Sequence, residues 1–247
     1  MIVLFTDFGL EGPYLGQVEA VLCAQAPGAR VIHLFSDLPP FDIQSAAYLL
    51  PVFVSRFPPD TVFLCVVDPG VGSNRSAVVA KIAGHWFVGP NEGLFALLTR
   101  RAASVECWQL PDSDAAAPSF HGRDVFAPAA ARLARGLAPM GEPVDAAALE
   151  RPDWPNDLLR IVYIDRYGNA MTGMRATSIP EGAALTIKGH TLKAARTFAD
   201  VVVGEPIWYE NANGMVELAE NRGRADAVLS LAVGDAITLY MKMTAPE

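Results

Sequence analysis

The sequence predicts an α/β fold in two parts, a largely parallel α/β sandwich followed by a smaller antiparallel β-barrel. In the first half, short apolar runs alternate with stretches of helical periodicity, as in βαβ units. A stretch rich in Pro and Gly interrupts this pattern, and short strands with Gly turns follow it. We therefore expect an N-terminal α/β domain over residues 1–156 and a C-terminal β-barrel domain over residues 157–247.

The first domain is expected to begin with a strand at 2–5 and a helix at 13–26, which Pro27 and Gly28 end. The alternation that follows predicts a mainly parallel sheet with helices on both faces. The other expected elements are strands at 31–35, 61–67, 77–82 and 86–88, and helices at 43–56 with a kink or early end at Pro51, from Leu94, and from His121 to Gly136.

The Pro- and Gly-bearing stretch near residues 136–155 is interpreted as a linker between the domains. Beyond it, short runs rich in β-formers predict a small sheet. These expected strands lie at 159–164, 184–188, 215–219 and 236–241.

The composition is that of a folded globular protein, with 51% hydrophobic and 19% charged residues. A net charge of −8, with no basic cluster beyond Arg100 and Arg101, argues against nucleic acid and favours a small-molecule substrate. The apolar runs are too short to span a bilayer, so no membrane partner is expected. Cys23, Cys65 and Cys107 lie far apart in apolar runs, which favours reduced core thiols and a cytoplasmic protein.

Several expected strands end in a polar turn that contains an aspartate. Asp7, Asp37 and Asp68 follow strands of the first domain, and Asp165 follows the first strand of the second. Ligands of open parallel sheets bind beyond the carboxyl ends of the strands, so the first three turns lie where we expect a site. The fourth turn suggests a site between the two domains.

Each candidate residue also has a purely structural interpretation. Asp7 could be a turn former or helix cap, or a carboxylate that accepts hydrogen bonds from two ribose hydroxyls. Asp68 could merely begin a turn, or it could deliver a carboxylate into a glycine-lined cavity close to Arg75. His121 could be a surface cap residue, whereas Gly122 would let a backbone amide approach a small ligand.

Other residues are equally open at this point. Asn169 could occupy a left-handed turn position, and Phe198 and Trp208 are core aromatics unless one of them stacks on a base. Arg123 and Asp124 are expected to form an ion pair that supports their loop. The four histidines are isolated from one another, so no metal site is expected.

Five motifs, which are weak signals singly, indicate a family when they are taken together in their order along the chain. They are Thr6-Asp7-Phe8-Gly9, Asp68-Pro69-Gly70-Val71-Gly72 with Arg75, Gly89-Pro90-Asn91-Glu92-Gly93, Phe120-His121-Gly122-Arg123-Asp124-Val125-Phe126-Ala127-Pro128, and Asp165-Arg166-Tyr167-Gly168-Asn169. This series closely resembles the S-adenosyl-L-methionine (SAM) hydroxide adenosyltransferases, relatives of fluorinase and chlorinase, over nearly the whole chain. The resemblance implies a cofactor-free enzyme that cleaves SAM with water to give adenosine and methionine. It also implies a homotrimer whose sites lie between the N-terminal domain of one subunit and the C-terminal domain of the next.

The resemblance assigns a role to each matching position. Asp68, Arg75 and His121 match a triad that activates water. The positions that match substrate contacts are Asp7 at the ribose diol, Phe41 near the sugar, Val71 and Gly122 in the same site, Asp165 and Asn169 at the methionine portion and the nucleoside, Phe198 stacked on adenine, and Asn221 and Arg222 at the adenine edge.

Two segments depart from the family pattern. The usual Pro-Asp-Asn-Gly is Pro90-Asn91-Glu92-Gly93, which is expected to alter the support of a loop. The Asn-Ser-Phe-Gly-like segment is Asn211-Ala212-Asn213-Gly214, which puts in doubt a hydroxyl contact to the carboxylate end of the substrate.

Three alternatives stay open beside hydrolysis of SAM. Halogenating relatives have uncharged residues at the positions of Asp68 and His121 and a hydroxyl donor at that of Gly122. A carboxylate would repel a halide, so water is the expected nucleophile and a SAM-dependent halogenase is an alternative. The others are a non-catalytic nucleoside-binding or SAM-binding protein of the same fold, and a divalent-metal hydrolase that uses Asp7, Asp68 and Asp124.

Overall fold

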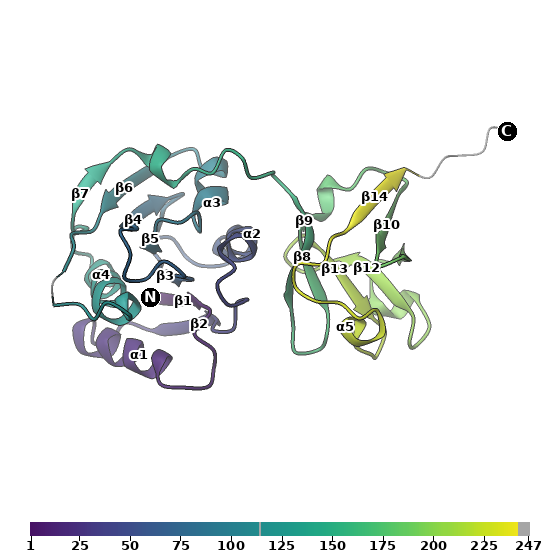
Figure 1. Cartoon of the computed structure of the whole chain (residues 1–247), viewed down its shortest axis with the longest axis horizontal. Helices are drawn as coiled ribbons and strands as arrows, with labels where there is room; N and C mark the ends of the chain where they lie inside the picture. The colour runs from purple at the N-terminus through teal and green to yellow at the C-terminus, as the bar shows by residue number, and fades with distance from the viewer. Residues whose placement is uncertain (114, 242–247) are drawn as a thin grey trace. The chain divides into compact units, whose positions relative to one another are not determined.

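The computed structural model describes residues 1–113 and 115–241. The chain forms two compact units that divide between Asp153 and Trp154, three residues before the boundary expected after residue 156 (Figure 1). No helix within the described residues is long and apolar enough to cross a membrane.

Unit 1 is built on a seven-stranded sheet of order β2-β1-β3-β5-β4-β6-β7. Every residue of β1 and β3 is buried, which explains why both are continuous apolar runs in the sequence. The strands are β1 (Ile2–Thr6), β2 (Val31–Phe35), β3 (Val62–Val66), β4 (Ala77–Ile82), β5 (His85–Pro90), β6 (Val105–Gln109) and β7 (Glu142–Val144).

Only half of this sheet is parallel, so the expectation of a largely parallel sheet is wrong in part. The pairs within β2-β1-β3-β5 are parallel, whereas β4 pairs antiparallel with β5 and β6, and β6 pairs antiparallel with β7. The reversal begins at a two-residue turn, Ala83-Gly84, whose φ angles of 48° and 82° are both positive. Such a turn closes a hairpin, so no helix separates β4 from β5.

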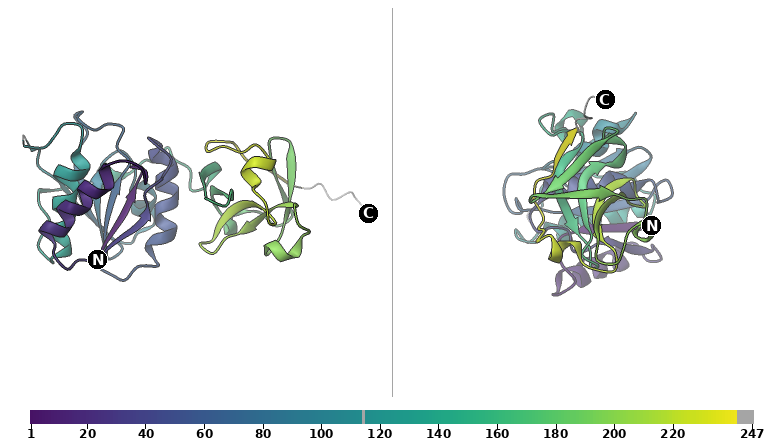
Figure 2. Two further views of the ribbon diagram at one scale, coloured as in Figure 1. Left: turned by 90° about the horizontal axis from the view of Figure 1, so that it is seen from below. Right: turned by 90° about the vertical axis from the view of Figure 1, so that its right-hand side faces the viewer.

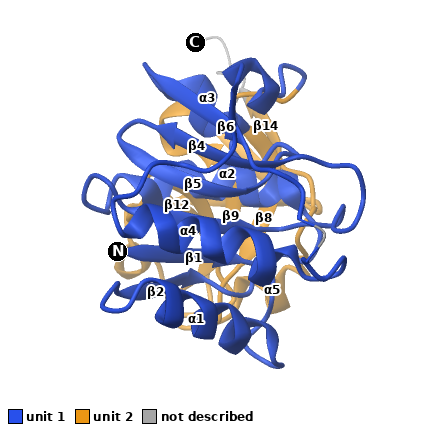
Figure 3. Cartoon of the chain, turned by 90° about the vertical axis from the view of Figure 1, so that its left-hand side faces the viewer, with its two compact units in different colours: residues 1–153 blue, residues 154–247 orange. Residues whose placement is uncertain are grey.

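Helices cover both faces of the sheet, as expected. Figure 3 shows α1 and α4 on one face of unit 1, and Figures 1 and 2 show α2 on the opposite face. The side chain of Asp42 caps α2 by accepting a hydrogen bond from Ser45 N, and the helix continues through Pro51. The helices are α1 (Tyr14–Gln25), α2 (Ile43–Val54), α3 (Ala96–Arg101) and α4 (Ala127–Ala134).

Part of the expected linker belongs to unit 1. It supplies the edge strand β7 and a 3₁₀ turn, Ala146–Leu149, and the side chain of Leu149 is only 1% exposed. Pro143 contributed to the interpretation of this stretch as a linker, but it lies in β7, because proline is tolerated in a strand at the edge of a sheet.

Unit 2 contains a second seven-stranded sheet, of order β14-β10-β11-β12-β13-β9-β8. The sheet curls, because Ile161 N donates to Asp235 O at 3.0 Å and Ile237 N donates to Leu159 O at 2.9 Å, which joins β8 to the segment before β14. The elements are β8 (Leu158–Ile164), β9 (Ala170–Arg175), β10 (Ala183–Ile187), β11 (His190–Ala194), β12 (Pro206–Glu210), β13 (Met215–Glu220), β14 (Thr238–Met241) and the short helix α5 (Ala225–Val228).

One pair in this sheet contradicts the expected antiparallel arrangement. Strands β11 and β12 run parallel, while the other pairs of named strands among the described residues are antiparallel. The connection between them is long enough to return the chain to the same end of the sheet, and it contains the 3₁₀ turn Phe198–Asp200.

Candidate active site

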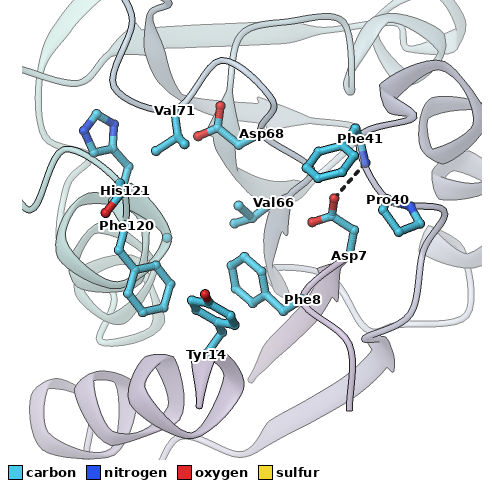
Figure 4. A pocket seen from close by; sticks show the side chains of 12 residues that line it. Asp7, Phe8, Tyr14, Pro40, Phe41, Val66, Asp68, Val71, Phe120 and His121 are labelled. Carbon is cyan, nitrogen blue, oxygen red and sulfur yellow. Dashed lines mark hydrogen bonds between the residues drawn. The ribbon is translucent and has the colours of Figure 1, made fainter. Parts of the chain in front are cut away.

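Two neighbouring strands deliver carboxylates to one edge of the sheet in unit 1. Thr6 pairs with Val66 at the ends of β1 and β3; Asp7 follows Thr6 directly, and Asp68 follows Val66 after one residue. Both side chains line a cavity of about 300 Å³ (Figure 4). The cavity is lined by Asp7, Phe8, Tyr14, Pro40, Phe41, Val66, Asp68, Val71, Ser119, Phe120, His121 and Gly122.

Asp68, Arg75 and His121 form a continuous hydrogen-bonded chain beside this cavity. Arg75 Nε donates to Asp68 Oδ1 at 2.8 Å, and Arg75 Nη2 donates to Asp68 Oδ2 at 2.5 Å. The two side chains are 7% and 6% exposed for Asp68 and Arg75, so this ion pair is screened little by water. Arg75 also lies over the ring of Phe126, with Cζ 5.2 Å from its centroid.

The same chain fixes the tautomer of His121. Arg75 Nη2 lies 2.9 Å from His121 Nδ1, and a guanidinium can only donate. We therefore assign Nδ1 as the acceptor and place the ring proton of a neutral imidazole on Nε2. His121 thus keeps an N–H donor for a ligand or a water molecule.

Glycine allows the loop that carries Arg75 to pack against the loop that carries His121. Gly72 has φ of +78°, and a Cβ there would lie 2.8 Å from the carbonyl oxygen of Pro118. Within the first loop, Ser73 Oγ donates to Gly70 O at 2.7 Å and accepts from Arg75 N at 3.2 Å. The Asp-Pro-Gly-Val-Gly motif is therefore needed for close backbone packing as well as for its carboxylate.

The expected Arg123–Asp124 ion pair is confirmed. Arg123 Nε and Nη2 donate to the two carboxylate oxygens of Asp124 at 2.6 and 2.8 Å. These bonds hold the pKa of Asp124 below its usual range. Asp124 also accepts from Ala117 N at 2.9 Å, so the pair ties the π-helical turn Gly122–Phe126 to the preceding loop.

Asp7 supports an unusual backbone conformation at Phe41. Asp7 Oδ2 accepts from Phe41 N at 3.0 Å, and Phe41 has φ of 64° with an exposed ring (Figure 4). Burial raises the pKa of Asp7, the amide of Phe41 opposes this rise, and the carboxylate of Asp68 adds to it. The other Asp7 oxygen has no role in this contact and can accept from a ligand hydroxyl.

Sequence reasoning gave no role to an aromatic wall of the cavity. The rings of Phe8, Tyr14 and Phe120 pack against one another with centroids 5.3 to 6.2 Å apart (Figure 4). Phe8 and Phe120 lie inside two of the motifs, and Tyr14 begins the helix that follows the first one. That shared position near one sheet edge is the signal that could have identified them.

Gly122 has a steric role that the sequence did not indicate. A Cβ at this position would lie 2.8 Å from Cζ of Phe8 and 3.5 Å from the ring of Phe120. The absence of a side chain at residue 122 therefore makes room for the Phe8 ring.

Unit 2 contains a second hollow, of about 620 Å³, which gathers four of the predicted substrate-binding residues: Asn169, Phe198, Asn221 and Arg222. The hollow is also lined by Tyr167, Glu220, Gly223 and Arg224.

Asp165 lies next to this group but bonds within its own turn. Its Oδ1 accepts from Tyr167 N and Asn169 N at 2.8 and 2.9 Å, and its Oδ2 accepts from Asn169 Nδ2 at 3.1 Å. The left-handed position in this turn belongs to Gly168, with φ of 84°, so that interpretation of Asn169 is wrong.

Comparison with known proteins accounts for both units. Residues 2–142 match the SAM hydroxide adenosyltransferase N-terminal domain, and residues 159–238 match the SAM hydroxide adenosyltransferase C-terminal domain. The chain belongs to the SAM hydroxide adenosyltransferase family.

Individual relatives match nearly the full length of this chain. An (R)-S-adenosyl-L-methionine hydrolase from Thermus thermophilus is 41% identical over 96% of this chain and 98% of its own. A Thermotoga maritima protein described as an uncharacterized conserved protein has a crystal structure that matches with a TM-score of 0.86 and 30% identity, over 97% of this chain and 99% of its own. A fluorinase from Actinoplanes is a more distant relative, 22% identical over 97% of each chain.

The first departure from the family pattern has a visible consequence. A Cβ at Gly70 would lie 2.8 Å from Oε1 and 2.9 Å from Oε2 of Glu92. Glu92 therefore packs directly under the loop that presents Asp68. Glu92 stands where the family pattern has Asn, and a side chain at residue 70 would have to displace its carboxylate.

The second departure lies in the turn between β12 and β13. Asn211 Oδ1 accepts from Asn213 N at 2.9 Å and from Met215 N at 3.1 Å, which fixes the turn without a hydroxyl side chain. Ala212 and Trp208 line a shallow hollow on this side of unit 2.

The backbone of Asn221 is already bonded within unit 2 of this family member. Its N–H donates to Glu205 O at 3.3 Å, and its carbonyl accepts from Gly204 N at 2.8 Å. A backbone contact from Asn221 to an adenine edge would therefore have to use the second lone pair of the carbonyl. Arg222 follows in a left-handed conformation, with φ of 59°.

The three cysteines are free, and two of them are buried. Burial raises the pKa of Cys65, and raises that of Cys107 to about 11. Cys23 is exposed on α1, so the expectation of a core thiol is wrong there. Within residues 1–113 and 115–241, no three His, Cys, Asp or Glu side chains are grouped so that they could hold a metal ion.

Proposed function

We propose that this protein hydrolyses SAM to adenosine and L-methionine by attack of water at the ribose C5′. The observation that carries the proposal is the buried Asp68–Arg75–His121 chain at the edge of a cavity that Asp7 also lines. The 41% identity to an (R)-S-adenosyl-L-methionine hydrolase over nearly the whole chain supports the same reaction.

The reaction makes its main demand on the nucleophile. The oxygen of water bonds to C5′ while the C5′–S bond breaks, and the electron pair of the C5′–S bond goes to sulfur, which neutralises the sulfonium. Methionine therefore leaves as a neutral thioether and needs no proton from a general acid. Water is a weak nucleophile, so the enzyme must orient it and take up its proton.

The geometry of the three side chains suits this task. Each oxygen of Asp68 keeps a lone pair that Arg75 does not use, so the carboxylate can accept a proton from water. The Nε2–H of His121 and the charge of Arg75 stabilise the developing hydroxide. General-base assistance of this kind contributes about 10²- to 10⁴-fold.

The other groups in unit 1 position the ribose. We assign the diol to Asp7, with Phe41 and Val71 near the sugar and Gly122 beside the reacting centre. The aromatic wall keeps bulk water away from C5′, and a site of low dielectric favours a reaction in which opposite charges meet. No cofactor or metal takes part in this scheme.

Unit 2 supplies the groups for the base and the methionine. Phe198 stacks on adenine, Asn221 and Arg222 contact its edge, and Asp165 and Asn169 hold the rest of the substrate. These groups lie in one unit and the water-activating chain in the other. We therefore assign the complete site to two adjacent subunits of a homotrimer, and the three free cysteines fit a cytoplasmic enzyme.

Hydrolysis in ¹⁸O-labelled water tests the reaction directly. Purified protein is incubated with SAM in labelled water that contains chloride, and adenosine is analysed by mass spectrometry. We expect one labelled oxygen, at the 5′ position. An unlabelled 5′-oxygen, or a 5′-halogenated nucleoside, would contradict the proposal.

Two controls separate the alternatives. Asp68→Asn and Arg75→Leu should each lower kcat by about 10²-fold or more, because they remove the proton acceptor or its partner. A binding protein without activity would show a trace turnover that neither substitution changes. Full activity after exhaustive chelation would exclude a divalent-metal hydrolase.

A further inference from the structure

Unit 2 contains a buried carboxyl group that the proposed reaction does not use. Glu217 of β13 is 3% exposed. Its Oε1 accepts from the hydroxyl of Tyr209, and its Oε2 accepts from Asn211 Nδ2 at 2.8 Å. A buried carboxyl group with both oxygens engaged by side chains is costly to remove, because its partners would be left without hydrogen bonds.

Tyr209 connects this group to the proposed base-binding ring. It lies directly opposite Glu217 in the β12–β13 pair, so the two side chains share one face of the sheet. The Tyr209 ring packs on that of Phe198, with centroids 5.2 Å apart. Burial strongly raises the pKa of Tyr209, so its hydroxyl remains protonated and donates to Glu217.

Asn211 connects the carboxyl group to a second substrate-facing segment. Its Oδ1 accepts from two backbone amides of its own turn, at Asn213 and Met215, so the orientation of the side-chain amide is fixed. Nδ2 must then point at Glu217 and has no freedom to exchange places with Oδ1. Glu217 is therefore bonded to the side chain that begins this turn.

We propose that Glu217 is a positioning residue, which sets the place of the Phe198 ring through Tyr209 and that of the 211–214 turn through Asn211. The described residues that line the two hollows of unit 2 include Phe198 and Asn211 but not Glu217. It therefore acts through its partners. The inference rests on the proposed function, in which Phe198 stacks on adenine.

Three substitutions at this group have distinct expected effects. Glu217→Leu leaves the Tyr209 hydroxyl and the Asn211 amide unpaired in a buried place, so both side chains move towards water. Glu217→Gln keeps both contacts, because its oxygen accepts from Asn211 and its amide donates to the Tyr209 oxygen. Tyr209→Phe retains the ring that supports Phe198 and removes only the hydroxyl.

The test measures kcat and KM for SAM, and Kd for adenosine by calorimetry. We expect Glu217→Leu to raise KM and the adenosine Kd by about tenfold, with a smaller change in kcat. Glu217→Gln should restore both constants to within about twofold of the wild type, and Tyr209→Phe should be intermediate. If Glu217→Leu does not fold, Tyr209→Phe and Glu217→Gln are compared instead. The inference then requires KM and the adenosine Kd to be higher in Tyr209→Phe than in Glu217→Gln.

Ile187→Ala is the matched control. Ile187 is 2% exposed in the core of the same unit, on β10, and does not belong to this group of contacts. We expect it to lower the melting temperature without changing KM or the adenosine Kd. The inference fails if Glu217→Leu leaves both constants within twofold of the wild type, or if Ile187→Ala raises them equally. If the wild-type protein does not hydrolyse SAM, the proposed function fails, and adenosine affinity still tests Glu217.

Discussion

Asp7 is a titratable residue of the cavity, and we assign it to substrate binding in the proposed function. Burial raises the pKa of its carboxyl group, and in the proposed reaction the ionised form accepts hydrogen bonds from the ribose diol. Protonation therefore removes an acceptor as the pH falls through this raised pKa. We expect KM for SAM to increase on the acid side of neutrality, at a higher pH than an ordinary aspartate would produce.

Asp7→Asn provides the control for this pH dependence. Its amide oxygen can still accept from Phe41 N, but the residue does not ionise between pH 5 and 8. We expect KM to be raised by about tenfold at all pH values, with the acid limb lost. An unchanged acid limb in this variant would assign the titration to another group.

Gly122 and Phe8 form a steric pair in the lining of the cavity, next to His121. A methyl group at residue 122 would meet the Phe8 ring at 2.8 Å, which is too close for any relaxed contact. We expect Gly122→Ala to displace the ring or the His121 backbone, and to lower kcat/KM by at least about tenfold. Phe8→Leu in the same chain removes the colliding ring atoms and should recover most of this loss.

A double-mutant cycle on kcat/KM and melting temperature measures the coupling. Phe8→Leu alone should cause a small loss, because leucine fills part of the space of the ring. Full activity of Gly122→Ala, or additive losses in the double variant, would show that the two positions are independent.

Among the elements, the β4–β5 hairpin contains a residue poorly suited to its conformation. Ala83 has φ of 48°, where an L-residue other than Asn, Asp or Gly is strained. Two-residue hairpins of this kind favour Asn-Gly. We expect Ala83→Asn to stabilise the protein by about 0.5–1 kcal/mol and to raise the melting temperature by about 1–4 °C.

Ala102→Asn is the matched substitution for the hairpin experiment. Ala102 follows α3 with φ of −89°, so asparagine has no conformational advantage there. Neither change should alter kcat, because neither residue lines the cavity. An equal gain from both variants would assign the effect to asparagine itself and not to the turn.

Some elements could be predicted from the sequence and others could not, for reasons that lie in their burial. Strands β1 and β3 are buried on both faces, so each contains a continuous apolar run, and such a run predicts a buried strand. The sequence analysis did not place β6, β7, β9, β11 or β12. Of these, β6, β7 and β11 are partly exposed and have no such run, whereas β9 is mostly buried and was missed as well. The parallel β11–β12 pair depends on where a loop returns, which local patterns do not encode.

The candidate site divides in the same way. Asp68 and His121 lie inside long motifs, so the sequence predicts them as candidates, and the structure gives the contacts that join them through Arg75. The contact between Phe8 and Gly122, and that between Glu92 and Gly70, are made between residues far apart in the sequence. Neither side of such a pair is unusual by itself, so only the folded chain reveals it.

At the scale of the whole molecule, the proposed site draws on both units, since Asp68 and His121 belong to unit 1 and Phe198 belongs to unit 2. In the proposed homotrimer, each site combines unit 1 of one subunit with unit 2 of the next. A subunit damaged in unit 1 can then complement a subunit damaged in unit 2. If each subunit formed its own complete site, two inactive variants could not restore activity to one another.

Coexpression of Asp68→Ala and Phe198→Ala subunits with two different affinity tags tests this arrangement. Two-step purification isolates trimers that contain both variants. In a closed ring of three such subunits, one interface always joins an intact unit 1 to an intact unit 2. We therefore expect about a third of the wild-type kcat per trimer, although each variant alone is nearly inactive. The pair Asp68→Ala and His121→Ala, both damaged in unit 1, should recover nothing. Recovery in that control, or its absence in the first pair despite a trimeric mass in light scattering, would contradict shared sites.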